Sequence, residues 1–234
     1  MKFTNETLLQ HYLEDLKLVD VTHGGKIKAH HPEHWNVPAI SNNTTFLNLT
    51  EEYNKGRNIY FWSDIHFHHK NIIRYSGRPY PNPDLMNQCL IGNYANIIKD
   101  DDIVIWGGDI TFGKIGEVNR ILTQLPGYKI HIIGNHDMDH HGKLNHLIFD
   151  ERHPCLVIDI IDHDIEFQFL VTHYPLDIVP HGTINIHGHI HQHLLASYNF
   201  NMCVEHTNYT PKHIKDFIDK AYGPGYCNPN ISPK

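Results

Sequence analysis

The sequence lacks an excess of positive charge. Lysine and arginine total 19 against 26 aspartate and glutamate residues, which gives a formal net charge of −7. A surface with this balance offers no broad electrostatic attraction to a polyanion, so long duplex nucleic acid is not expected as a partner. Bound divalent cations would add local positive charge, and small anionic substrates therefore remain compatible with the composition.

The chain also lacks a long apolar run at its start and any Cys-x-x-Cys pair. The opening residues, MKFTNETLLQHYLEDLK, carry acids where a signal peptide or membrane anchor would be apolar. We therefore expect a cytoplasmic protein that does not contact a membrane. The cysteines are far apart, which favours reduced, mostly buried thiols over disulfides or a zinc knot. They are Cys89, Cys155, Cys203 and Cys227.

Histidine, by contrast, is abundant, with 23 copies among 234 residues. Imidazole is the commonest metal ligand in proteins. Because an exposed histidine costs little, the number alone proves nothing, and the positions of the histidines must decide.

The hydrophobic pattern divides the chain into three parts. Residues 1–57 are predicted to be an extension, with helical spacing over 5–19 followed by irregular loops and at most a short strand. We interpret this extension as a strap packed on the main domain, with partner binding or oligomerisation as the alternative. Residues 58–220 carry the main domain, and the tail 221–234, which holds several prolines and glycines, is expected to be loose.

Short apolar runs recur between turn signals in the main domain, as is typical of buried strands. Apolar stripes over 84–98 and 115–125 predict two helices that cover a sheet, and Thr210-Pro211 is expected to cap and open a last helix. This alternation predicts an α/β fold. The predicted strands are Ile59–Trp62, Ile103–Trp106, Ile130–Ile133, Leu156–Ile161, Phe167–Val171 and Ile184–Ile186.

Polar segments follow five of these strands closely. In open α/β sheets the carboxyl ends of the strands meet along one edge, so residues distant in sequence converge there on a ligand. The sequence therefore predicts that the five segments share one pocket. They are Ser63-Asp64-Ile65-His66, Gly107-Gly108-Asp109, Gly134-Asn135-His136-Asp137, Thr172-His173 and Gly188-His189-Ile190-His191.

The residue types in these segments suit hard or borderline divalent cations. Imidazole and carboxylate bind zinc, iron, manganese or nickel, whereas the lack of thiolates argues against copper(I) and iron–sulfur clusters. In extended backbone an Asp-x-His spacing points alternate side chains the same way, which predicts that Asp64 and His66 hold one ion together. The pair His189 and His191 repeats this spacing. Each motif alone is weak, but five in order favour a two-metal site.

Glycines beside the motifs relieve steric limits where the backbone turns beneath the ions, so alanine there should strain the site. These glycines are Gly107, Gly108, Gly134 and Gly188.

The sequence resembles the calcineurin-like metallophosphoesterase superfamily, because it contains that superfamily's motifs in the same order. These motifs are D-x-H, G-D, G-N-H-D, H and G-H-x-H. The likeness spans about residues 58–219. The segment Asp64-Ile65-His66-Phe67, followed by His69-Lys70-Asn71-Ile72-Ile73 and Arg78-Pro79, is similar to a branch of small bacterial and phage phosphoesterases. Ile65 and His68 depart from the pattern, which places a small hydroxyl residue and a glycine there, and both departures concern the substrate edge.

The resemblance implies a four-layer β-sandwich flanked by helices, to which the N-terminal extension is added. It also implies two divalent ions, with manganese favoured and iron, zinc or nickel as alternatives. Asp109 would bridge the ions. Asp64, His66, Asp109 and His191 would hold one ion, and Asp109, Asn135, His173 and His189 the other. For catalysis, His136 would contact the phosphoryl group or protonate the leaving oxygen, and Asp137 would orient the site.

These expectations describe a dinuclear metallophosphoesterase, in which the ions ionise the attacking water and offset the phosphate charge. Proton donation by His136 matters most for poor alkoxide leaving groups, so a phosphodiesterase of nucleotides or other small phosphoesters is favoured over a phosphomonoesterase. The candidate substrate-binding residues are Asn135, His136, His69 and Arg78. Arg78 and, with less weight, Arg74 are expected to clamp phosphate, with a solvated surface role as the alternative.

Three rival functions remain. A non-catalytic scaffold of the same fold is disfavoured by His136 and by the complete ligand set. A nuclease that acts on polymers would need a basic surface. A structural zinc domain would need cysteine-rich coordination.

Overall fold

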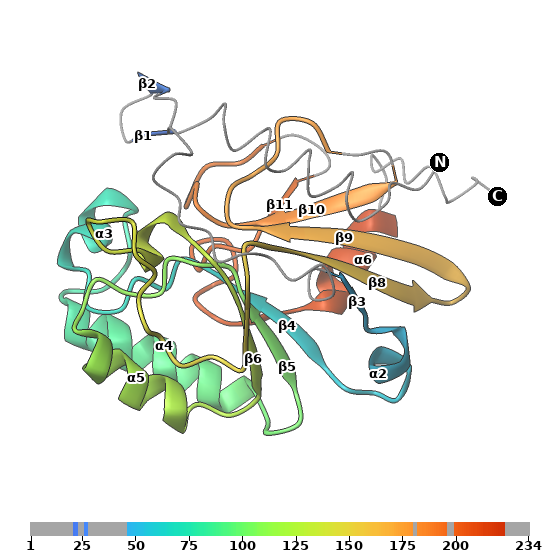
Figure 1. Cartoon of the computed structure of the whole chain (residues 1–234), viewed down its shortest axis with the longest axis horizontal. Helices are drawn as coiled ribbons and strands as arrows, with labels where there is room; N and C mark the ends of the chain where they lie inside the picture. Colours follow the sequence, from blue (N-terminus) through green and yellow to red (C-terminus); the bar gives the residue numbers. More distant parts are fainter. Residues whose placement is uncertain (1–20, 23–25, 28–45, 180–181, 196–198, 223–234) are drawn as a thin grey trace.

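The computed structural model describes residues 21–22, 26–27, 46–179, 182–195 and 199–222. Within these ranges the chain forms two mixed five-stranded sheets and a small two-stranded one, with helices beside them (Figure 1), which confirms the predicted α/β class. The helix predicted over 5–19, most of the loops predicted up to residue 45 and residues 223–234 of the predicted tail lie outside the described residues. Residues 221–222 of that tail are not loose, because they belong to the last helix.

The two-stranded sheet lies in the predicted extension. It pairs β1 (Val21–Thr22) with β2 (Lys26–Ile27) in antiparallel fashion. Residues 46–54 also belong to the predicted extension, but they form β3 (Phe46–Asn48) and α2 (Thr50–Asn54), and β3 joins a main sheet beside β8. The main body therefore includes residues before 58.

The first main sheet has the strand order β12-β4-β5-β6-β7. Its members β4 (Ile59–Trp62), β5 (Ile103–Trp106), β6 (Tyr128–Ile132) and β7 (Glu151–His153) run parallel, and β12 (Lys212–His213) is antiparallel to β4. Parallel strands are buried on both faces, which explains the continuous apolar runs of β4 and β5. The first three predicted strands are confirmed.

The second main sheet has the order β11-β10-β9-β8-β3. A two-residue turn with positive φ at both positions joins β8 (Cys155–Asp162) to β9 (Ile165–Thr172) as an antiparallel hairpin. β9, β10 (Thr183–His187) and β11 (Asn199–Asn201) are parallel to one another, and β3 is parallel to β8. The other three predicted strands are confirmed as β8, β9 and β10.

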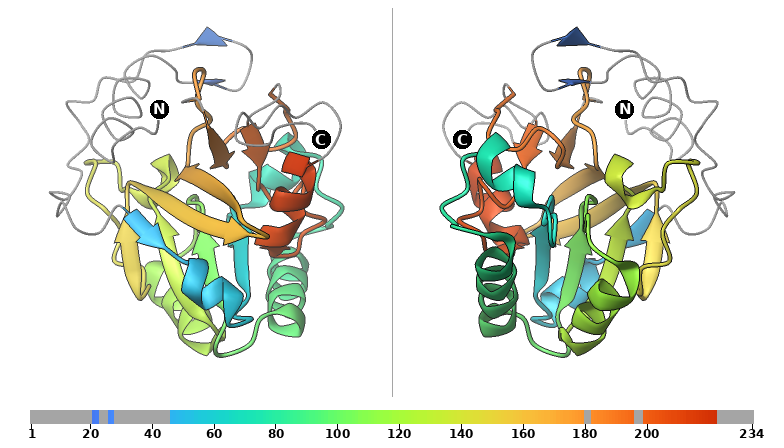
Figure 2. Two further views of the ribbon diagram at one scale, coloured as in Figure 1. Left: turned by 90° about the vertical axis from the view of Figure 1, so that its right-hand side faces the viewer. Right: turned by 90° about the vertical axis from the view of Figure 1, so that its left-hand side faces the viewer.

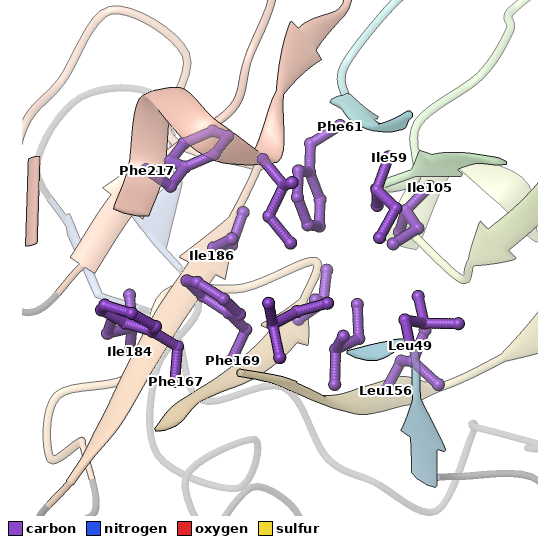
Figure 3. Packing of buried hydrophobic residues seen from close by; sticks show 14 of the residues in the cluster. Leu49, Ile59, Phe61, Ile105, Leu156, Phe167, Phe169, Ile184, Ile186 and Phe217 are labelled. Carbon is purple, nitrogen blue, oxygen red and sulfur yellow. The ribbon is translucent and has the colours of Figure 1, made fainter. Parts of the chain in front are cut away.

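The core lies between the two sheets and follows from the period of two along each strand. In β4, Ile59 and Phe61 point to this core, whereas Tyr60 and Trp62 point to the other face. Figure 3 shows Ile59, Phe61 and Ile105 of the first sheet facing side chains of the second. Those second-sheet side chains include Leu156, Phe167, Phe169, Ile184 and Ile186.

Helices α4 (Pro83–Ile97) and α5 (Ile115–Gln124) pack on the outer face of the first sheet, as predicted. The side views place both helices below the strands of the second sheet (Figure 2). Asn82 caps α4, because its side chain accepts a hydrogen bond of 2.9 Å from the Leu85 N–H, and proline follows at the first helical position. The short helix α3 (Lys70–Tyr75) was not predicted.

The predicted start of the last helix is wrong. Helix α6 (Ile214–Tyr222) begins only at Ile214, and Lys212–His213 forms the edge strand β12. Thr210 does not cap the helix, because its hydroxyl donates to the Thr207 carbonyl at 2.7 Å in a turn. Lys212 and His213 pair instead with Phe61 and Tyr60 of β4, which satisfies backbone groups at the sheet edge.

None of the helices in the described ranges combines the length and apolar character that a bilayer crossing requires. Of the cysteines described, Cys155 and Cys203 are buried and Cys89 is exposed, and all three are free thiols.

Candidate metal centre

The five polar segments predicted from the sequence meet where the two sheets end. Three segments follow β4, β5 and β6 of the first sheet, and two follow β9 and β10 of the second. Backbone hydrogen bonds tie the segments together. The Asp64 N–H donates to the Gly108 carbonyl at 3.1 Å, and the His189 N–H donates to the Asp64 carboxylate at 3.0 Å. The second bond joins the two sheets directly at the site.

Six predicted ligands fall into two groups, and within each group the ligand atoms all lie within 4.8 Å of one another. The first group is Asp64, His66 and His191, all buried. The second group is Asp109, His173 and His189, of which His189 is partly exposed. The grouping matches the two ligand sets that the resemblance implied.

Asp109 lies between the groups. Its Oδ1 is 3.4 Å from Nε2 of His173, and its Oδ2 is 3.6 Å from Nε2 of His66. Each carboxylate oxygen therefore faces a ligand of a different group, which is the geometry that a bridging carboxylate needs.

His173 is oriented for metal binding by its other ring nitrogen. Nδ1 lies 2.7 Å from the Gly107 carbonyl, an acceptor for the Nδ1 proton, and this contact turns Nε2 toward the second ligand group. Nε2 is 2.9 Å from Oδ1 of Asn135, so the seventh predicted ligand lies with the second group. Burial alone would lower the pKa of His173, but the Asp109 and Asp64 carboxylates raise it to about 10.

The donor set fits divalent cations. Nε2 of His66 and Nε2 of His189 are buried without a hydrogen-bond partner. Burial holds the pKa of both imidazoles well below the usual value, so both are neutral at pH 7, the form that binds a metal. A buried nitrogen without a partner is costly, and coordination to a cation would satisfy it.

The backbone at the ligands is not extended, which corrects the geometric reason given for the Asp-x-His and His-x-His spacings. The alternation of the strand stops at its last residue, and the ligands lie in the left-handed region, which costs about 1–2 kcal/mol per non-glycine residue. The φ values are +57° for Asp64, +53° for His66, +55° for Asp109, +70° for His189 and +47° for His191.

The expected strain from alanine is confirmed at the four glycines beside the motifs, because an added Cβ would come within 3.0 Å of neighbouring atoms at each. Gly108 has φ of +96°, and its Cβ would lie 2.7 Å from Nδ1 of His173. At Gly134 the Cβ would collide with the backbone nitrogen and Oδ1 of Asp109.

His136 is the exposed member of the site. Its side chain is 44% exposed, and its Nε2 lies 3.9 Å from Oδ2 of Asp109. Its backbone N–H donates to Oδ1 of Asp109 at 2.8 Å, which helps to fix the orientation of that carboxylate. The imidazole can therefore reach a molecule bound beside the ligands.

Asp137, which the resemblance assigned to orienting the site, is fully buried. Its carboxylate accepts hydrogen bonds from the N–H groups of Asp109, Ile110 and Gly134 at 2.8–3.0 Å. It also lies 2.8 Å from Nε2 of His131, a buried residue that the sequence analysis missed. Asp137 thus holds the segments after β5 and β6 together.

Arg78 is also buried, which contradicts its prediction as a phosphate clamp. Its guanidinium donates to the carbonyls of Asp64 at 2.6 Å and Ile65 at 2.9 Å. It also forms an ion pair of 2.8 Å with Glu205. A longer contact of 3.5 Å joins the guanidinium to the sulfur of Met86. The charged contacts and the two carbonyl bonds together support the first ligand segment.

Glu205 was missed by the sequence analysis. Its Oε1 lies 3.2 Å from Nδ1 of His191, so that His191 is held between a carboxylate and the first ligand group. Burial would raise the pKa of Glu205, but the hydrogen bond from His191 and the charge of Arg78 outweigh it and hold the pKa at about 2. The only sequence signal was its position after β11, a strand of three residues.

Two further missed contacts hold Asp64. Its Oδ2 accepts from the Ser63 hydroxyl at 2.5 Å and from the Cys203 thiol at 3.2 Å. His191, Cys203 and Glu205 also form a compact group of ligand atoms. We assign this third group the role of positioning the first ligand group and not of binding an ion, because Glu205 is already paired with Arg78.

Of the remaining predicted residues, His69 lies beside the first ligand group, with its ring centroid 5.3 Å from that of His66. His69 is partly exposed and stacks on Phe112, with ring centroids 3.8 Å apart. Burial is the main cause that lowers the pKa of His69 to about 4, so it is neutral at pH 7 and offers no positive charge to phosphate. Arg74 is exposed in α3, with its guanidinium 5.2 Å from the ring of Tyr75.

No family model matches the chain. A curated relative, the uncharacterized protein MJ1445 of Methanocaldococcus jannaschii, is 34% identical over 170 residues, which cover 66% of this chain and 86% of the relative. Among solved structures, the chain is similar to the protein of unknown function AQ665 from Aquifex aeolicus, with a TM-score of 0.52 and 26% identity. That match covers 70% of this chain and 98% of the other.

Proposed function

Because the chain belongs to the family of the uncharacterized protein MJ1445, whose name gives no activity, we propose a function from the geometry of the site. The protein is a dinuclear metal-dependent hydrolase of phosphoesters, and phosphodiesters of nucleotide or similar size are its preferred substrates. It is thus a metallophosphoesterase, in line with the resemblance of its motifs to the calcineurin-like superfamily.

The observation that carries this proposal is the position of Asp109. Its two carboxylate oxygens face His173 and His66, which belong to different ligand groups. A single-ion site would not need two adjacent groups, and a structural zinc site would be closed by four protein ligands, commonly cysteines. Two groups that share a carboxylate and lie beside an exposed histidine favour a two-metal catalytic centre.

Divalent ions bound in the two groups would lower the pKa of a nearby water and offset the charge of a phosphate. The protein's own residues supply the rest. Asp137 fixes the backbone on which Asp109 and Gly134 lie, and Glu205 orients His191. His136, with 44% of its side chain exposed, is placed to donate a proton to the leaving oxygen.

Proton donation by His136 favours diesters over activated monoesters, because an alkoxide leaves poorly unless it is protonated. The net charge of −7 gives no support to a nuclease that binds long duplexes. A non-catalytic scaffold would have no need for an exposed histidine beside complete ligand groups. We retain the four-layer sandwich as part of this proposal, since two sheets and one helical layer on the first sheet are its core components.

The test is a metal and substrate screen on the purified protein. With manganese we expect two bound ions per chain by elemental analysis, and faster hydrolysis of bis-p-nitrophenyl phosphate than of p-nitrophenyl phosphate. Asp109→Asn should lose bound metal, whereas His136→Ala should keep metal and lose about 10²- to 10⁴-fold in kcat.

His140→Ala is the matched control, because His140 is an exposed histidine four positions away that contacts no ligand group in the described structure. It should match the wild type. A single ion per chain would refute the dinuclear centre, equal activity of His136→Ala and wild type would remove the proton donor, and a faster monoester would overturn the diester preference.

A further inference from the structure

Phe112 is an exposed aromatic residue held rigidly next to the ligand groups. Its exposed fraction is 46%, although burial of a phenyl ring is strongly favourable. Its backbone N–H donates to the Phe67 carbonyl at 3.0 Å, and the hydroxyl of Thr111 donates to the same carbonyl at 3.0 Å. These hydrogen bonds fix the backbone that carries the ring, so the exposed position of the ring is a feature of the fold.

Three histidines surround the ring. His69 stacks on Phe112 at 3.8 Å between centroids with an interplanar angle of 21°, and His136 lies 4.5 Å away with a tilt of 52°. The ring of His66, a member of the first ligand group, is 5.5 Å away. Single exposed apolar residues are common and need no explanation, but this ring is part of a wall that runs from His69 to the proton donor.

We propose that the wall of His69, Phe112 and His136 binds an aromatic ring in the leaving group of the ester, either a nucleobase or an aryl group. This inference rests on the proposed hydrolase function. His136 defines the side on which the leaving oxygen departs, so the alcohol attached to that oxygen extends past His136 and meets Phe112.

The chemistry of the wall selects an aromatic partner. Aromatic rings pair favourably at centroid distances of about 4.5–7 Å, and stacking on an aromatic side chain accepts any nucleobase because each has a π face. The His69 ring, stacked on Phe112 at 3.8 Å, extends the flat surface of the wall. The site therefore distinguishes esters by the planarity of the leaving group.

The experiment compares two diesters with the same leaving-group chemistry, benzyl methyl phosphate and cyclohexylmethyl methyl phosphate. Both leave as primary alcohols of similar bulk, and only one carries a π system. We expect the manganese-loaded wild type to prefer the benzyl ester by about tenfold in kcat/KM, within the range that stacking on one side chain contributes. Phe112→Leu keeps an apolar side chain and should reduce this ratio to near one.

Binding gives a readout that does not depend on turnover. Benzylphosphonate and cyclohexylmethylphosphonate cannot be hydrolysed, and calorimetric titration of the manganese-loaded protein should show tighter binding of the benzyl compound in wild type only. Tyr128→Leu is the control, since Tyr128 is an exposed aromatic at the first residue of β6, at the end of the strand opposite the site. It should keep the wild-type preference in both assays.

The outcomes separate the two proposals. If both esters are cleaved equally, or Phe112→Leu keeps the preference, the aromatic site is refuted while the hydrolase stands. If no ester is cleaved but the phosphonate preference is present and depends on Phe112, the hydrolase fails and the aromatic site holds. Absence of both turnover and preference refutes both.

Discussion

Single residues at the candidate site are held in costly conformations by neighbours that do not bind an ion themselves. Asp64 and His66 have positive φ, and Asp64 is also fully buried. Arg78 compensates for this by donating to the carbonyls of Asp64 and Ile65. Residues in sparsely populated backbone regions persist when the surrounding structure over-determines them, and here that structure is a buried ion pair.

We predict that Glu205→Gln weakens metal binding at the first ligand group by about 10- to 100-fold, the usual effect of losing a partner that orients a ligand histidine. The amide keeps the shape of the side chain but removes the charge that pairs with Arg78 and attracts the Nδ1 proton of His191. Competition of manganese against a fluorescent chelator measures the affinity.

Glu151→Gln is the matched control, because Glu151 also pairs with a histidine, His153, at 2.9 Å, but lies in β7 away from the ligand groups. It should bind manganese like wild type. An unchanged affinity in Glu205→Gln would show that the carboxylate does not orient His191.

At the scale of elements, strands with a strong apolar signal were predictable and short edge elements were not. Ile59–Trp62 and Ile103–Trp106 were predicted to the residue, because strands buried on both faces are continuously apolar. β11 (Asn199–Asn201) and β12 (Lys212–His213) are polar edge strands of two or three residues, and only their pairing partners define them. Both strands form by pairing with segments far away in the chain, and a local sequence pattern does not show such pairing.

The same division applies to the candidate site. The convergence of the seven candidate ligands was predictable because each follows a predicted strand in the order of known motifs, and all seven lie together. The role of Arg78 was mistaken because sequence does not show whether an arginine is buried. Glu205 escaped notice because its preceding strand carries no apolar signal.

Helix α6 connects the two sheets through one aromatic side chain. Phe217 packs edge-on against Phe61 of β4, with ring centroids 5.3 Å apart, and lies 5.7 Å from Phe200 of β11. Figure 3 shows Phe217 beside Phe61 and above Ile184 and Ile186. The helix therefore closes one side of the core.

We predict that Phe217→Ala lowers the free energy of unfolding by about 3–5 kcal/mol, the typical cost of removing a buried phenylalanine ring. Urea denaturation followed by tryptophan fluorescence measures the change. Lys215→Ala, on the exposed side of the same helix, is expected to change stability by less than about 0.5 kcal/mol. A loss below about 1 kcal/mol in Phe217→Ala would mean that α6 does not complete the core.

At the scale of the whole molecule, the candidate centre joins the two sheets. Asp64, Asp109 and Asn135 follow strands of the first sheet, whereas His173, His189 and His191 follow strands of the second. Ions held by both sets would crosslink the sheets at the end where the strands stop. In the absence of cations, the same place gathers buried carboxylates, and burial together with the charge of Asp109 raises the pKa of Asp64.

We therefore predict that metal stabilises the whole fold and not only the loops that carry the ligands. A ligand that binds only the folded state at a free concentration of about 100 times its Kd adds about 2.7 kcal/mol per site. For a chain of this size each kcal/mol raises Tm by about 2–4 °C, so one filled site raises Tm by about 5–11 °C.

Differential scanning calorimetry with manganese, against protein treated with EDTA, measures the shift. Asp109→Asn removes the carboxylate whose two oxygens face His66 and His173 and should lose most of the shift, whereas Phe112→Leu leaves all candidate ligands in place and should keep it. An equal shift in Asp109→Asn and wild type would mean that manganese binds elsewhere, because a centre that joins the two sheets through Asp109 cannot stabilise the fold once that bridge is gone.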